Sequence, residues 1–159
     1  MTAVQQSGNV TANHLAVWAT NGVIMDGGVV LASEKVLTKA FSVNFNDTAD
    51  VPLLLPTAIT AFKLQQILIT NASISMTAAV GGFYPQASKA GTAIVAASQV
   101  YSSLSTAAVL LQATLASFAT ANAFSASNLT AWSIYFALTT PQGAAATADI
   151  YICGIPLLP

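Results

Sequence analysis

From residue 41 onward, short segments of alternating apolar and polar residues are separated by clusters of glycine, proline and asparagine. In the first of them, FSVNF, the alternation places Phe41, Val43 and Phe45 on one side of a strand. Segments of this length and spacing are typical of antiparallel sandwiches and barrels. The sequence therefore predicts an all-β protein, with an antiparallel, jelly-roll-like β-sandwich over residues 41–159.

Two later segments make finer predictions about strand geometry. In FKLQQILIT the apolar residues break strict alternation, which predicts a β-bulge near Gln65 and Gln66. In the segment WSIYFAL, Trp132, Ile134 and Phe136 fall on one side of a strand and Tyr135 falls on the other.

Charged residues are scarce, and this scarcity limits the surface that the chain can expose to water. Only 6% of the residues are Asp, Glu, Lys or Arg, against about 25% in an average soluble domain. The 59 residues of 90–148 carry no charge at all. Because the cores of protein interfaces show the same depletion, we expect a homo-oligomer with much of its surface buried.

The same composition argues against nucleic-acid and membrane partners. Nucleic-acid binding depends on neutralising phosphates with basic side chains, and this chain has four lysines, no arginine and a net charge of −1. The most apolar long stretch, 107–124, contains Gln112, Ser117 and Asn122. It therefore falls short of the ~20 predominantly apolar residues of a membrane-spanning helix.

Residues 13–28 predict a β-hairpin ahead of the sandwich. Asn21-Gly22 suits a two-residue type I′ turn, and a two-residue turn pairs Trp18 with Met25. Apolar residues then occupy both faces of a hairpin that is marginally stable by itself. We therefore expect it to attach to another chain, and its predicted interface residues are His14, Leu15, Val17, Trp18, Ile24 and Met25.

The predicted domain organisation follows from this hairpin. Residues 1–32 form an arm for attachment and oligomer contacts, and 41–159 form the sandwich. Between them, residues 33–40 carry three of the chain's nine charges, which favours a linker or a short helix.

Groups suited to catalysis or metal binding are few and scattered. His14 is the only histidine, and a catalytic histidine needs a nucleophile and an orienting acid beside it. Asp47, Asp50 and Asp149 are candidate carboxylates, but the segment FNDTADVP has the composition of an ordinary turn. The single Cys153 lies among apolar neighbours, which predicts a buried structural thiol. We expect no enzymatic activity, no cofactor and no metal site.

The segment SGNVTANHLAVWATNGVIMDGG, Ser7 to Gly28, resembles the N-terminal segment of many tailed-bacteriophage virion proteins, including tail-fibre, head-fibre and other appendage subunits. Asn13 and Asn21 depart from that pattern, at positions where glycine and aspartate are common. The resemblance covers about one seventh of the chain and implies a homotrimeric structural protein whose N-terminal segment attaches or threads. The matching residues are Gly8, Asn9, Val10, Thr11, His14, Leu15, Trp18, Gly22, Val23, Asp26, Gly27 and Gly28.

Together these observations predict a non-enzymatic virion protein, assembled in the host cytoplasm. The first hypothesis is a capsid decoration or cement subunit that docks onto other virion proteins, such as the major capsid protein, through its arm. The alternative is a tail-fibre, baseplate or adhesin subunit that attaches to the host and binds glycans through exposed aromatics such as Phe83, Tyr84 and Tyr101. The simpler interpretation of these three residues is that they belong to the core or to an interface.

Overall fold

A computed structural model describes residues 5–6, 14–19, 23–29 and 33–157, with side chains described for 33–157. The chain divides into two compact units, residues 1–32 and 33–159, and each is considered by itself. The strands of the first unit are β1 (Gln5–Gln6), β2 (His14–Ala19) and β3 (Val23–Val29). The elements of the second are β4 (Lys35–Asn44), β5 (Val51–Leu54), β6 (Ala61–Thr70), β7 (Val80–Tyr84), β8 (Leu110–Gln112), α1 (Ser117–Ala121), β9 (Ala123–Ser125), the 3₁₀ turn η1 (Thr130–Trp132), β10 (Ser133–Thr140) and β11 (Thr147–Pro156).

In the N-terminal unit, β2 and β3 form the predicted antiparallel pair, and β1 pairs in parallel with β3. The register predicted from a two-residue turn is wrong by one residue, because Trp18 pairs with Ile24 rather than with Met25. Three residues, 20–22, separate the strands, and they lie outside the described residues. Hairpin connections of three residues also favour a glycine, so the sequence Asn21-Gly22 did not fix the length of the turn.

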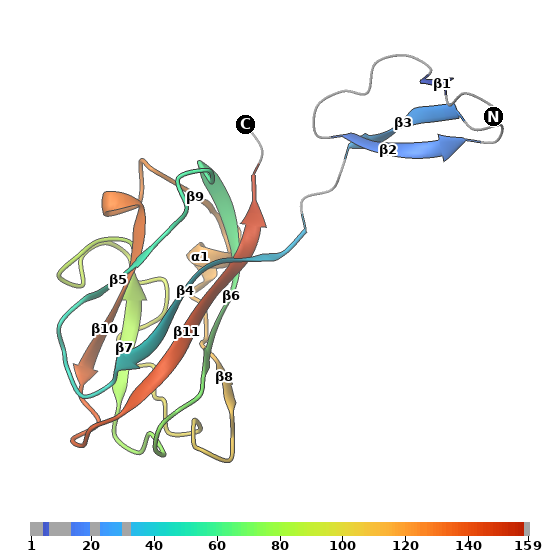
Figure 1. Ribbon diagram of the computed structural model, residues 1–159. Helices are drawn as coiled ribbons and strands as arrows, with labels where there is room; N and C mark the ends of the chain where they lie inside the picture. Colours follow the sequence, from blue (N-terminus) through green and yellow to red (C-terminus); the bar gives the residue numbers. More distant parts are fainter. Residues whose placement is uncertain (1–4, 7–13, 20–22, 30–32, 158–159) are drawn as a thin grey trace. The chain divides into compact units, whose positions relative to one another are not determined.

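The second unit is a sandwich of two antiparallel sheets, as predicted. One sheet has the order β4-β11-β6-β8, with β9 pairing farther along β6, and the other has the order β5-β10-β7. These strands run side by side in Figure 1. Isolated bridges join β7 to the 95–100 segment, at Val80–Val100 and Phe83–Val95. Successive strands from β4 to β8 alternate between the two sheets.

The core lies between the sheets and has an aromatic centre. The ring of Phe136, on β10, lies 4.9 Å from Phe45, 5.1 Å from Phe83 and 6.1 Å from Tyr101, measured between centroids. All four side chains are almost fully buried. As predicted, Ile134 shares the main core with Phe136, whereas Tyr135 packs against Tyr84 on the other side of the strand. Trp132 packs against the same core, but from the turn η1 and not from a strand.

The expected linker at 33–40 is wrong, because β4 begins at Lys35 and pairs along its length with β11. The first pair of this ladder joins Lys35 to Gly154. Charged residues gather here because β4 is an edge strand with one face in solvent, and lysines are common on such edges. High local charge therefore marked an exposed strand and not a connection.

The ladders of this sheet contain three register shifts, and two of them bear on the sequence predictions. Cys153 pairs with Gln66 while Gly154 pairs with Leu64, so Gln65 is the extra residue and the bulge predicted near Gln65 and Gln66 is confirmed.

The second bulge overturns the prediction that Phe41 shares one side of the strand with Val43 and Phe45. Phe41 is 58% exposed, whereas Val43 and Phe45 are buried. Both Phe41 and Ser42 stand opposite the single residue Asp149, and Ser42 has a φ of +51°. The carboxylate of Asp149 accepts the Ser42 N–H at 2.8 Å, which stabilises the bulge that turns Phe41 outward.

A buried glutamine connects the turn before β11 to the loop before β7. Gln142 Oε1 accepts the backbone N–H groups of Ala78 and Ala79 at 3.0 and 3.1 Å. Its Nε2 donates to the Ser75 carbonyl and to Thr77 Oγ1. Gln142 is 8% exposed, so these amide groups depend on one another for hydrogen bonding.

We expect Gln142→Leu to lower the free energy of unfolding by about 2–4 kcal/mol, because unpaired buried polar groups each cost about 1–3 kcal/mol. Urea unfolding followed by circular dichroism measures the change. The control is Gln86→Leu, at an exposed glutamine, which should shift stability by less than about 0.5 kcal/mol. Equal effects of the two variants would contradict the role assigned to Gln142.

Candidate functional site

The six predicted attachment residues lie on the first two long strands of the N-terminal unit. His14, Leu15, Val17 and Trp18 belong to β2, and Ile24 and Met25 belong to β3. The ladder joins Val17 to Met25 and Trp18 to Ile24. Their side chains lie outside the described residues, so the structure pairs their backbones without testing the attachment role.

A different surface emerges on the sandwich, on the side of the β4-β11-β6-β8 sheet that faces away from the core. We name this surface the outer face. Among residues 33–157, three of the large apolar side chains left most exposed belong to strands of this sheet: Val36 at 54%, Phe41 at 58% and Leu110 at 56%. Half-buried Leu68 and Tyr151 lie between them. Exposed apolar patches on a folded domain mark interaction sites.

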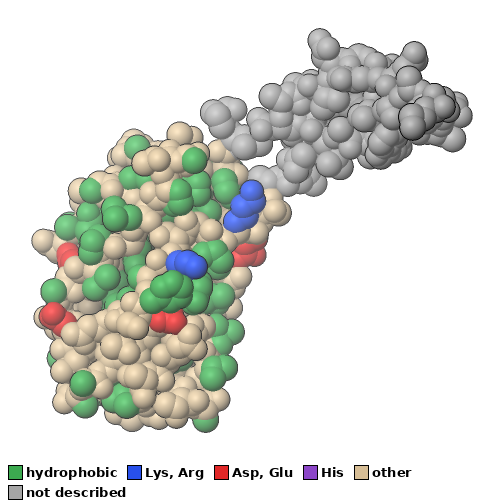
Figure 2. All heavy atoms as spheres, viewed as in Figure 1, with side chains coloured by type: hydrophobic (Ala, Val, Ile, Leu, Met, Phe, Trp, Pro, Cys, Tyr) green, Lys and Arg blue, Asp and Glu red, His purple; other side chains and the backbone are tan. Residues whose placement is uncertain are grey.

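An aromatic and cationic group forms the centre of the outer face. The rings of Phe41 and Tyr151 meet edge to face with centroids 6.1 Å apart, and the Lys39 ammonium lies 4.9 Å from the centroid of Phe41. Figure 2 shows apolar side chains beside one basic and one acidic side chain over β4 and β11. Aromatic side chains supply much of the binding energy at interfaces, so this group is suited to contact a protein surface.

Cys153 lies on the same sheet and is buried, as the sequence predicted. It pairs with Gln66 of β6 on one side and with Val36 of β4 on the other. Gln66 Nε2 donates to Glu34 Oε1 at 2.6 Å, and this hydrogen bond joins residues on the two sides of β11 beside the thiol. Burial, and secondarily the charge of Glu34, raise the pKa of the Cys153 thiol. The thiolate, which is the reactive form, is therefore disfavoured in the folded protein.

We expect Cys153 in the folded protein to react slowly with a thiol reagent such as iodoacetamide. Gln66→Ala should increase the rate of this reaction several-fold, because it removes the side chain that shields the thiol from solvent. The control Gln112→Ala removes an exposed glutamine of the same sheet and should leave the rate unchanged.

The raised pKa of Cys153 also predicts that stability depends on pH, since the thiol of the unfolded chain ionises near pH 8.5 while the folded thiol stays protonated. The free energy of unfolding should therefore decrease as the pH rises above that value, and Cys153→Ala should weaken the decrease.

The candidate carboxylates each hold a backbone amide rather than forming a common site. Asp47 accepts the N–H of Ala49 at 3.0 Å, in the turn that the sequence predicted. Asp50 accepts the N–H of Ser88. Asp149 accepts the side-chain amide of Asn71 at 2.7 Å, in addition to Ser42. Among the residues that the structure describes, no group of three or more His, Cys, Asp or Glu side chains is arranged to hold a metal ion.

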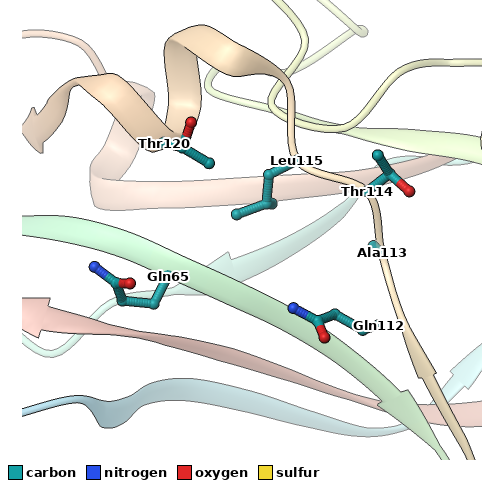
Figure 3. Close-up of a pocket in the computed structure, with 6 residues that line it drawn as sticks. All are labelled: Gln65, Gln112, Ala113, Thr114, Leu115 and Thr120. Carbon is teal, nitrogen blue, oxygen red and sulfur yellow. The ribbon is translucent and has the colours of Figure 1, made fainter.

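Shallow depressions on the sandwich are lined by uncharged side chains. One of about 350 Å³ lies where β6, β8 and the segment leading into α1 meet. Figure 3 shows Gln65 and Gln112 along the strands and Leu115 and Thr120 on the side of α1. Amide and hydroxyl groups of this kind suit a neutral polar ligand.

The aromatic residues that the host-attachment alternative would use to bind glycans are buried, in agreement with the simpler interpretation that they are core residues. Phe83 and Tyr101 are fully buried and Tyr84 is 4% exposed. The hydroxyl of Tyr101 donates to the Gly81 carbonyl at 3.2 Å, and burial raises the pKa of this tyrosine strongly. Phe83 and Tyr84 belong to β7, and the 95–101 segment forms backbone hydrogen bonds alongside that strand.

Comparison of this chain with protein-family models, with curated proteins and with solved structures finds no match. In the described part of the chain, none of the helices has the length and apolar character needed to cross a membrane.

Proposed function

We propose that this protein is a non-enzymatic structural subunit of a bacteriophage virion, and specifically a capsid decoration or cement subunit. The observation that carries the proposal is the outer face, where Phe41, Val36 and Leu110 are each more than half exposed. In a chain with 6% charged residues, electrostatic repulsion between copies is weak, so the copies can associate. An apolar face on such a chain supports a protein that works inside an assembly.

The N-terminal segment supports the bacteriophage part of the proposal, through its resemblance to virion appendage proteins. In this proposal residues 1–32 dock onto another virion protein, such as the major capsid protein, and the sandwich forms a homo-oligomer, a trimer, on the particle. Assembly takes place in the host cytoplasm. The positions of the carboxylates fit a non-catalytic role, since Asp47, Asp50 and Asp149 are each bonded to a backbone amide.

The second candidate is a tail-fibre, baseplate or adhesin subunit that contacts the host. The uncharged depression lined by Gln65, Gln112 and Thr120 favours it, because amides and hydroxyls match the hydroxyl groups of a neutral glycan. Labelling the protein on intact virions and locating it by electron microscopy separates the two functions. Many copies over the head indicate a decoration subunit, and a few copies at the tail indicate a fibre or baseplate subunit.

We expect Trp18→Ala to weaken binding of the full chain to particles that lack the protein, by about 2–4 kcal/mol of association free energy, as for a central aromatic anchor. Occupancy of the particles measured against protein concentration gives the affinity. The control Leu54→Ala changes an exposed side chain on the other sheet and should bind like wild type. Unchanged occupancy for Trp18→Ala would show that the arm is not the attachment element.

A further inference from the structure

The outer face has apolar side chains at both of its margins. Val36 and Phe41 lie on β4, which forms one edge of the sheet, and Leu110 lies on β8, which forms the other. Val109, just before β8, is 61% exposed. An antiparallel sheet with one face on the core usually presents polar residues on the other, so both margins depart from the normal pattern.

The register of the sheet places the two margins at the same height along the strands. Asp149 of β11 stands opposite the bulge that contains Phe41, and on its other side it pairs with Thr70 of β6. Thr70 in turn pairs with Leu110 of β8. Phe41 and Leu110 are therefore in one row across the sheet, three strand spacings or about 14 Å apart.

We propose that a second copy of this chain covers the outer face, with the β4 margin of one copy packed on the β8 margin of the next in a closed ring of three. The symmetry axis of this ring is parallel to the strands, so rotation about it does not change the position of a residue along the strand direction. Because Phe41 and Leu110 lie at the same position along that direction, Phe41 of one copy meets Leu110 of its neighbour. Closed cyclic symmetry is the common form of soluble homo-oligomers. The inference, including the number of three copies, rests on the homotrimer of the proposed function, and it names the surface that forms that trimer.

Charge supports a second copy as the occupant. The chain has a net charge of −1, so copies meet with little repulsion. The outer face carries Lys39 beside Phe41 and Asp149 in the row of Leu110, and a face with both signs suits another copy of itself. An occupant with a strong charge of either sign has no matching charge here.

A neighbouring copy could contact β4 in two ways, by backbone pairing along its edge or by side-chain packing on its outer face. The edge is poorly suited to backbone pairing. Its ladder with β11 is bulged at Phe41 and Ser42, and Ser42 has a positive φ. Lys35 and Lys39 lie along it. Bulges and lysines are features that block edge-to-edge pairing, so contact through the apolar side chains is the geometry that remains.

An engineered disulfide tests the arrangement in the full chain. In the double variant Phe41→Cys with Leu110→Cys, the two positions of one chain are too far apart to bond, since a disulfide needs Cα atoms within about 7 Å. Oxidation should therefore yield covalent dimers and trimers on a non-reducing gel, ending at three chains. Native Cys153 is buried, and oxidised wild-type protein gives the background.

The matched control is Leu54→Cys with Leu110→Cys, because Leu54 is 66% exposed on the other sheet; it should stay at the wild-type background. Absence of covalent oligomers above that background in the test variant overturns the ring. Dimers formed by Phe41→Cys alone overturn it too, because they indicate a two-fold contact. If residues 1–32 of the same chain cover this face instead, the test variant stays monomeric on the gel, and the ring is overturned.

Sedimentation of the wild-type protein separates this inference from the proposed function. A monomer at micromolar concentration overturns the homo-oligomer and the ring together. An oligomer whose double variant does not cross-link overturns only the assignment of the surface. A stable fold of each variant is checked by its circular dichroism, and all three substituted side chains are exposed in the sandwich.

Discussion

The sandwich depends on the aromatic core between its sheets, because the strand ladders alone join parts of the chain that are far apart. β4 pairs with β11, at the other end of the sandwich sequence, while its neighbour β5 belongs to the opposite sheet. Such ladders form only after long loops close, which costs conformational entropy. The ring of Phe136 lies 4.9 Å from that of Phe45 and 5.1 Å from that of Phe83. Burial of these rings offsets that cost.

The same core leaves the outer face free for another purpose. Alternation along β11 sends Ile150 and Ile152 to the core and Tyr151 to the outside. The outer residues are not needed to close the sandwich, so the exposed apolar side chains of Phe41 and Leu110 contribute little to its stability. Their presence, in a chain with so few charges, favours an interface between copies over a solvent-exposed surface.

Polar side chains complete the fold at positions where strands deviate or end. Asp149 stabilises the bulge at Ser42 and also binds Asn71, which has a φ of +53° just after β6. Gln142 performs the corresponding role between two loops. These two side chains explain how a sequence poor in charge satisfies backbone groups that no ladder reaches.

The sequence by itself determined the class of fold and the local features of strands. Alternation identified an antiparallel sandwich, placed Ile134 and Phe136 inward, and located the bulge at Gln65, because side-chain period and its interruption are local properties of a strand. Burial of Cys153 followed from its apolar neighbours in the same way.

Only the tertiary structure decided the features that depend on residues distant in the chain. Phe41 faces outward because Asp149, 107 residues after Ser42, stabilises a bulge there. Residues 35–40 are a strand because β11 supplies its partner, and Phe83, Tyr84 and Tyr101 are buried because other segments cover them. The row that joins Phe41 to Leu110 exists only once four strands are in register. No pattern within one segment contains that information, since register is set by pairing across the sheet.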